Sequence, residues 1–197
     1  ISNKFLVSAS KGIIPESFLS ISEHLNKEYN IPKKNLAIIS GPSHAEEVAQ
    51  EKLTYLTVGT RNSKLGKYIS ELLKTKYIIS TVSSDMIAIE YSSSLKNIYS
   101  IMVGIAHGLG YGDNFLSVLI SHCSKEMSDF IKVVHKTGIK INHSAYLGDL
   151  LVTTYSSFSR NRTFGNMIGK GYSIKSAKAE MDMIVEGYYA TKNAFML

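Results

Sequence analysis

The sequence has 197 residues, 44% of them hydrophobic, and its 22 Lys and Arg exceed its 16 Asp and Glu to give a net charge of +6. These values predict a globular protein of one large or two small domains. No membrane span is expected, because the apolar-rich stretch from Ile98 to Ile105 is far shorter than the roughly 20 residues of a spanning helix. The lysines are scattered, so nucleic acid is not an expected partner. A small molecule that carries phosphate fits the positive charge better.

The cysteine content and the start of the sequence bear on location and completeness. The single cysteine, Cys123, cannot form a disulfide within this sequence, which suits a reducing, cytoplasmic location. The sequence begins without methionine and shows no signal-peptide pattern. We therefore expect a fragment, or a chain whose upstream segment is not included.

The first eighty residues alternate between short β-rich runs and helical patterns. Strands are expected at 4–10, 35–40, 54–59 and 76–82, with helices in the intervening segments around 15–29, 44–51 and 62–73. Asn62 is suited to cap the third helix, whose inner face is expected to contain Leu65, Ile69, Leu72 and Leu73. Strand and helix in alternation predict a parallel α/β layer.

From residue 85 onward the pattern is helical, with no convincing alternating strand. The stretch from Ser92 to Gly108 is apolar on several faces, which predicts a buried helix. Asp113 is suited to cap a long helix, and further helices are expected at 145–155, 173–181 and from 184 to the end. The fold class is therefore α/β followed by all-α, with the boundary near residues 82–86.

Lys96 and Asn97 lie in the predicted buried helix. Burial removes solvation from a lysine and lowers its pKa, so that it can exchange a proton near neutral pH. The alternative is that the Lys96 side chain reaches solvent from the helix start. The spacing does not decide between the two.

Two strand ends carry residues suited to an anion. Lys11 follows the first strand, where ligands of parallel sheets bind, although a solvated loop lysine would look the same. Gly41 and Ser43 lie between a strand and a helix: Gly41 permits a positive φ or close backbone approach, and Ser43 is suited to cap the helix. His44 by itself is interpreted as a capping or surface residue.

A second group of polar residues follows near position 150. Asp149 and Thr153 are one helical turn apart, on one face. Arg160 and Asn161 offer a guanidinium fork and an amide that suit a phosphate, although by itself an Arg-Asn-Arg run is more typical of a solvated surface loop. No metal site is expected, because the histidines and the cysteine show no ligand spacing.

Five stretches together resemble a known family. SASKGI, GPSHAEEVA, SLKNIYSIMVGIAHGLGYGDN, GDLLVTTYSSFSRNRTFG and IVEGYYATKNAF look like the successive signature blocks of bacterial-type NAD(P)-dependent glycerol-3-phosphate dehydrogenase. The resemblance implies the second half of a Rossmann domain followed by a helical substrate domain. It also implies interconversion of sn-glycerol 3-phosphate and dihydroxyacetone phosphate with NAD or NADP, for phospholipid synthesis in the cytoplasm, and it allows a homodimer.

The resemblance also assigns roles to residues. Lys96 is the implied catalytic residue, the proton acceptor when the alcohol is oxidised. The implied substrate contacts are Lys11, Gly41, Ser43, Lys96, Asn97, Asp149, Thr153, Ser159, Arg160 and Asn161. The implied cofactor contacts are Lys11, Ala45, Arg160, Ile184 and Glu186. No metal is implied.

The sequence departs from the family pattern at both ends. The glycine-rich pyrophosphate loop expected well before SASKGI is not present, and the family's last helices are expected to be cut off after NAFML. Residues 1–83 are thus expected to form a partial Rossmann domain and residues 84–197 a helical substrate domain truncated at its C-terminus. Two alternatives stay open: a non-catalytic fragment or phosphometabolite-binding module, and a related dehydrogenase of another hydroxy acid.

Overall fold

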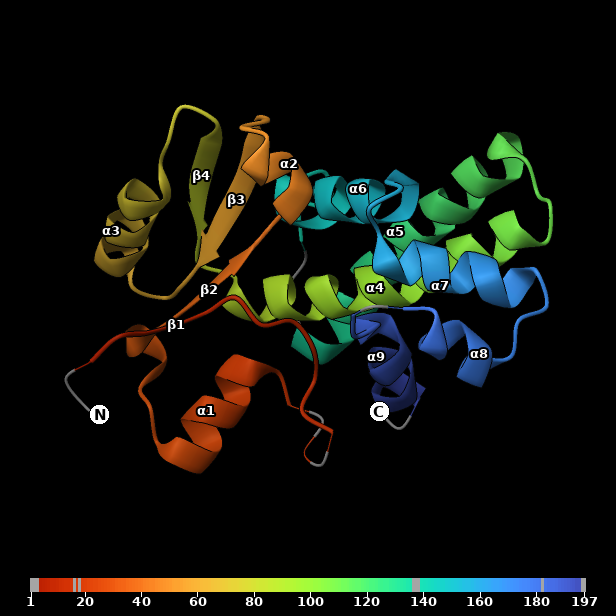
Figure 1. Cartoon of the computed structure of the whole chain (residues 1–197). Coiled ribbons are helices and arrows are strands. Elements are labelled where there is room, and N and C mark those ends of the chain that lie inside the picture. Colours follow the sequence, from red (N-terminus) through yellow and green to blue (C-terminus); the bar gives the residue numbers. More distant parts are fainter. Residues whose placement is uncertain (1–3, 16, 18, 136–138, 182, 196–197) are drawn as a thin grey trace.

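A mixed four-stranded sheet forms one side of the molecule and a group of helices the other, as the computed structural model shows for residues 4–15, 17, 19–135, 139–181 and 183–195 (Figure 1). The strands are β1 (Leu6–Ser8), β2 (Leu36–Ser40), β3 (Thr54–Gly59) and β4 (Ile78–Ser83), in the spatial order β1-β2-β3-β4. The α/β-then-helical organisation expected from the sequence is confirmed.

The alternation of strands and helices predicted a parallel sheet, and this prediction is wrong for one strand pair. β1 pairs with β2 and β3 with β4 in parallel, but β2 pairs with β3 in antiparallel register. The reason lies in α2 (Ala45–Ala49), a helix of 5 residues with none buried. Such a helix does not cover a sheet face, so the chain turns back beside β2 instead of crossing over to a parallel position.

α3 (Ser63–Leu73) covers one face of the sheet, and the helical part of the molecule lies against the other. α3 is capped by the Asn62 side chain, as expected, and packs through Leu65 and Ile69 against Ala37 and Val58. Leu72 was also expected on this inner face but is 67% exposed, because the buried face of α3 runs through Leu65 and Ile69 and does not include it. The other side chains of β2 face the helical part of the molecule, in keeping with the two-residue period of a strand.

The remaining helices surround a central one. In the chain, α1 (Ile21–Tyr29) and the short 3₁₀ turn η1 (Lys33–Asn35) follow β1 and precede β2. α4 (Met86–Gly108) is the central helix, and around it are α5 (Asp113–His135), the π-helical turn η2 (Ser144–Gly148), α6 (Asp149–Tyr155), α7 (Arg160–Gly169), α8 (Ile174–Ala179) and α9 (Glu186–Phe195) (Figure 1). α7 was not expected: its Arg-Asn-Arg start was interpreted as part of a loop.

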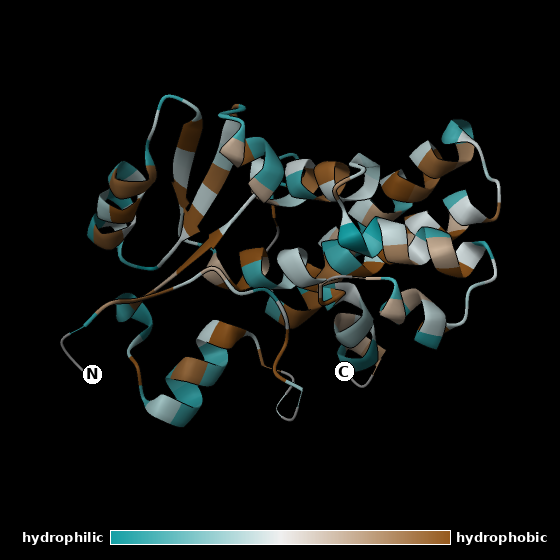
Figure 2. Cartoon of the chain, viewed as in Figure 1, coloured by the Kyte–Doolittle hydropathy of each residue, from teal (hydrophilic) through white to brown (hydrophobic). Residues whose placement is uncertain are grey.

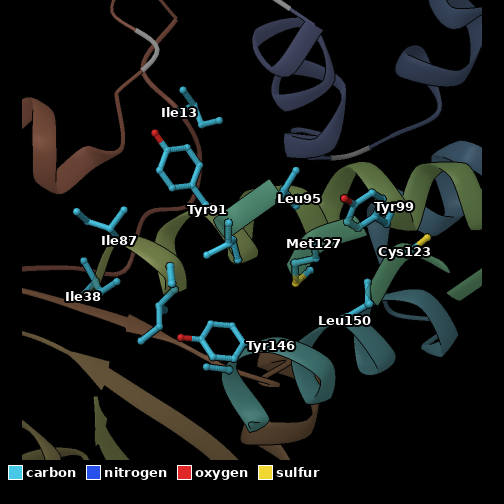
Figure 3. Packing of buried hydrophobic residues seen from close by; sticks show 14 of the residues in the cluster. Ile13, Ile38, Ile87, Tyr91, Leu95, Tyr99, Cys123, Met127, Tyr146 and Leu150 are labelled. Atoms are coloured by element: carbon cyan, nitrogen blue, oxygen red, sulfur yellow. The ribbon is translucent and has the colours of Figure 1, made fainter. Parts of the chain in front are cut away.

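The main core is built around α4. Buried side chains of α4 such as Ile87, Leu95 and Tyr99 pack with Met127 of α5 and Leu150 of α6 (Figure 3). Ile38 of β2 belongs to the same cluster, so one core joins the sheet to the helices. The strongly hydrophilic first turn of α7 contrasts with this interior (Figure 2). Of the helices that the structure describes, none has the length and hydrophobicity to cross a membrane.

Glycines bring α4 and α7 into backbone contact. Gly104 and Gly108 of α4 lie against the backbone of Arg162 and Asn166, and Gly165 and Gly169 of α7 lie against the carbonyls of Ile101 and Ile105. A Cβ at any of these four glycines would lie closer to a backbone oxygen than van der Waals contact allows. The four missing side chains therefore set the separation of the two helices.

We expect Gly165→Ala to lower the free energy of unfolding by about 1–3 kcal/mol, because the added methyl group overpacks the contact with the Ile101 carbonyl. Urea denaturation of this chain measures the change. Gly112→Ala is the control, since a Cβ there meets nothing within 4 Å. Equal stability of the two variants would contradict the close-contact role of Gly165.

Candidate functional site

A cavity of about 290 Å³ lies where the sheet part meets the helices. Its wall is formed by the segments that follow β1 and β2, by Lys96 and Asn97 of α4, and by residues at or near the starts of α6, α7 and α9. The lining residues are Lys11, Ser43, His44, Ala45, Glu46, Lys96, Asn97, Asp149, Val152, Thr153, Phe158, Ser159, Arg160, Asn161, Met183 and Glu186. Polar groups from six chain segments thus converge on one space.

The centre of the cavity wall is an ion pair between Lys96 and Asp149. The Lys96 ammonium donates a hydrogen bond to Asp149 Oδ1, and the two residues are 5% and 1% exposed. The expectation that Lys96 lies in a buried helix is confirmed, and its side chain does not reach open solvent. A lysine and a carboxylate that are both removed from water must compensate each other's charge.

The environment of Lys96 adjusts its proton affinity. Burial lowers the pKa of Lys96 from 10.5 to about 8, the Asp149 carboxylate raises it, and the nearby positive charge of Lys11 lowers it further. A lysine with a pKa near 8 can both hold and release a proton close to neutral pH. The site therefore contains a proton donor and acceptor at the edge of a cavity.

Local backbone structure positions Asp149. The π-helical turn η2 ends at Gly148, and Asp149 opens α6 directly after it. The Ser40 hydroxyl at the end of β2 approaches Asp149 Oδ2 at 3.5 Å. Thr153, one turn later, donates to the Asp149 carbonyl at 2.6 Å, so both residues face the cavity as their spacing predicted. π-helical turns often occur at functional sites.

The start of α7 forms a second wall. Ser159 is buried and caps α7 by accepting from the backbone N–H of Arg162 at 3.3 Å. The Ser159 and Ser100 hydroxyls lie 3.0 Å apart, which ties this cap to α4. Asn161 is also buried, so the Arg-Asn-Arg run is not a solvated loop. The N-terminus of a helix attracts anions, and the half-buried Arg160 adds a guanidinium there.

α9 closes the cavity beside α7. The Asn97 amide donates to Glu186 Oε2 at 3.1 Å, and the Gly187 backbone N–H donates to Asn161 Oδ1 at 2.9 Å. Gly187 also lies directly against the Asn97 carbonyl, where a Cβ would not fit. The first turn of α9 is therefore fixed to both α4 and α7.

Lys11 is held by a contact that spans the chain. The Asn193 amide of α9 donates to the Ile13 carbonyl at 3.0 Å, and both residues are buried. Gly12, between Lys11 and Ile13, has a φ of 136°, which favours glycine. The loop that carries Lys11 is thus attached to the last helix that the structure describes.

Two comparisons decide the family. The profile of the NAD-dependent glycerol-3-phosphate dehydrogenase C-terminus matches residues 85–197, and that of the N-terminus matches residues 2–66. The first match alone covers more than half of the chain. This chain belongs to the NAD-dependent glycerol-3-phosphate dehydrogenase family.

Several relatives of the family are similar over nearly the whole chain. The protein named glycerol-3-phosphate dehydrogenase (NAD(P)+) from Bacillus velezensis is 37% identical over 194 residues, which are 97% of this chain and 56% of that protein. Its counterpart from Bacillus subtilis is 36% identical with the same coverage. The crystal structure of glycerol-3-phosphate dehydrogenase from Coxiella burnetii has a TM-score of 0.93 and 31% identity, covering 100% of this chain and 59% of that one. The chain thus spans little more than half the length of these relatives.

Most residues that the family resemblance singled out lie together in the cavity. Eleven of the expected site residues line it, and only Gly41 and Ile184 do not: Lys11, Ser43, Ala45, Lys96, Asn97, Asp149, Thr153, Ser159, Arg160, Asn161 and Glu186. Gly41 instead makes the turn after β2, with a φ of 134° and no room for a Cβ, which would lie 2.5 Å from the Tyr55 carbonyl oxygen. Ile184 is exposed and lines an adjoining cavity of about 370 Å³, which shares Met183 with the first.

Sequence reasoning gave other lining residues too little weight. The N-cap of α2 is His44 and not Ser43, and its side chain makes no capping hydrogen bond. His44, Phe158 and Met183 all line the cavity. Only position offered a signal for them: each is within three residues of an expected site residue. No cluster of three or more His, Cys, Asp or Glu suited to a metal ion occurs among the described residues.

We expect the Lys96 amine to titrate at about pH 8 in this chain, observed by NMR of lysines labelled at the ε-carbon. Asp149→Asn removes the charge that raises this pKa, so the midpoint falls. Lys11→Gln removes a charge that lowers it, so the midpoint rises. A wild-type midpoint near 10.5, or a shift of both variants in the same direction, would contradict this account of the site.

Proposed function

We propose that the full-length protein interconverts sn-glycerol 3-phosphate and dihydroxyacetone phosphate with NAD or NADP. One observation carries the proposal: the buried Lys96–Asp149 pair and the start of α7, with Arg160 and Asn161, line the same cavity. A proton donor beside an anion site is what a substrate with a carbonyl and a phosphate requires. The relatives are named as glycerol-3-phosphate dehydrogenases, which supports the same activity.

In this proposal each wall of the cavity has a separate task. In the reductive direction the Lys96 ammonium gives its proton to the oxygen at C2 as the carbonyl becomes an alcohol, and in oxidation the neutral amine takes it back. Asp149 holds the Lys96 side chain and stabilises its charged form. Arg160 and Asn161 bind the phosphate, and Lys11 orients the substrate between the two ends.

The residues present fit the reacting end of a nicotinamide cofactor. Lys11, Ala45, Arg160 and Glu186 share the cavity wall, and Ile184 lies in the adjoining cavity. The nicotinamide, when bound, supplies or accepts the hydride at C2. The chain's own part is to hold C2 of the substrate for that transfer and to keep the Lys96 proton beside the oxygen at C2. These residues account for one end of the cofactor.

We also propose the wider assignments that the resemblance implies. Residues 1–83 serve as part of a dinucleotide-binding domain and residues 84–197 as the substrate-binding domain. The product supplies the backbone of phospholipids, the location is cytoplasmic and the assembly is a homodimer. The single cysteine of this chain, the buried Cys123, is in keeping with a reducing compartment.

The proposed role of Lys96 is tested by Lys96→Ala in the full-length protein. We expect kcat for dihydroxyacetone phosphate reduction to fall by roughly 10²–10⁴, the contribution of a general acid, with little change in cofactor affinity. Oxidation of NADH and of NADPH, followed by ultraviolet absorbance, measures it. Lys125→Ala, at an exposed lysine of α5, is the control. Activity of Lys96→Ala within a few-fold of the wild type would refute the role.

The proposed phosphate contact is tested by Arg160→Lys. A lysine keeps the charge but loses the planar fork, so we expect KM for dihydroxyacetone phosphate to rise about tenfold or more while the folded state is retained. Steady-state kinetics give KM, and a thermal melt checks the fold. Arg162→Lys is the neighbouring control, because Arg162 does not line the cavity. An unchanged KM for Arg160→Lys would exclude the bidentate contact.

A further inference from the structure

The cavity wall contains a buried polar atom that has no hydrogen-bond partner among the described residues. His44 Nε2 is buried and has no hydrogen-bond partner among the residues that the structure describes. His44 lines the cavity and, although it is the N-cap residue of α2, its side chain caps nothing. A buried nitrogen without a hydrogen-bond partner costs free energy, which is recovered when a ligand supplies the partner.

The position of His44 indicates which part of a ligand it meets. Its ring packs against that of Phe158, with the ring centroids 6.1 Å apart. Phe158 directly precedes Ser159 and Arg160, which open α7. His44 is therefore on the section of wall that continues into the proposed phosphate contacts.

The charges of the cavity wall explain why a further donor is needed there. Its described residues include three cations, Lys11, Lys96 and Arg160, and three anions, Glu46, Asp149 and Glu186. Lys96 is engaged by Asp149, and among the described residues the Arg160 guanidinium donates to the Met183 thioether, a weak acceptor, at 2.9 Å. A phosphate monoester would add up to two negative charges to a wall whose formal charges already cancel.

We propose that His44 is a specificity-determining ligand of the substrate phosphate, its Nε2–H donating a hydrogen bond to a phosphoryl oxygen. The ligand class is a small phosphate monoester, and the inference rests on the proposed function. The Phe158 ring packs against the imidazole and limits its orientation. His44 lies at the cavity edge directly before α2, which begins at Ala45.

The test compares two histidines in this chain. His44→Phe removes the donor and keeps an aromatic ring against Phe158. His24→Phe is the matched control, because His24 also has a buried nitrogen without a partner, Nδ1, and packs against a tyrosine ring at 5.9 Å, but does not line the cavity. Isothermal calorimetry measures binding of inorganic phosphate and of sn-glycerol 3-phosphate, with glycerol as the uncharged comparison.

We expect His44→Phe to weaken binding of both phosphate ligands roughly tenfold, as loss of a hydrogen bond to a charged group does, while His24→Phe binds as the wild type. His44→Gln, which keeps a donor, should recover part of the affinity. In the wild type, nitrogen NMR of the imidazoles should show the His44 Nε2 resonance shift on addition of phosphate. This second readout does not depend on the folding of a variant.

The outcomes separate the two proposals. If wild-type affinity persists in His44→Phe and the His44 resonance does not move, while Arg160→Lys binds phosphate weakly, His44 is not a phosphate ligand and the proposed phosphate contact stands. If the wild type binds neither phosphate ligand, the phosphate contact itself is refuted, and the role of His44 with it.

Discussion

The buried pair of Lys96 and Asp149 is the constraint that the surrounding structure has to satisfy. Removing two charges from water costs several kcal/mol for each ion, and an apolar pair of similar size is often as stable or more so. Stability alone therefore does not explain the pair. α4, the end of β2 and the start of α6 hold both partners in contact. Burial lowers the pKa of Lys96 to about 8, although the Asp149 carboxylate raises it. In the proposed function this pKa lets Lys96 exchange a proton near neutral pH, which gives the pair a chemical role.

Close backbone contacts set the distance between this pair and the rest of the site. α7 lies against α4 through glycines on both helices, and α9 lies against α4 at Gly187. Ser159 and Asn161, six and four residues before Gly165, thereby reach the same cavity as Lys96. Because backbone and not long side chains makes these contacts, the walls of the cavity are held in place before any ligand binds. Preorganisation of this kind lowers the entropy lost on binding.

Much of this arrangement could be predicted from the sequence. The alternation of the first part, the Asn62 cap, the buried helix with its lysine and the shared face of Asp149 and Thr153 all follow from local periodicity, and the structure confirms them. The antiparallel pairing of β3 was not predictable in this way, because it depends on α2 not covering a sheet face. α7 was missed because its polar first turn resembles a loop, and only packing against α4 shows that Asn161 is buried.

Net charge is the clearest example of a sequence feature that does not describe the site. The chain carries +6 overall, which favours anionic ligands in general, but the described cations and anions of the cavity wall are equal in number. Attraction over the whole surface can steer a phosphate towards the molecule, yet it does not distinguish the cavity from other positions. In the proposed function, recognition inside the cavity depends on the direction of individual donors: the fork of Arg160, the helix end at Ser159 and the His44 nitrogen that has no partner among the described residues. Directional donors hold a phosphate in one orientation, which the proposed hydride transfer at a neighbouring carbon requires.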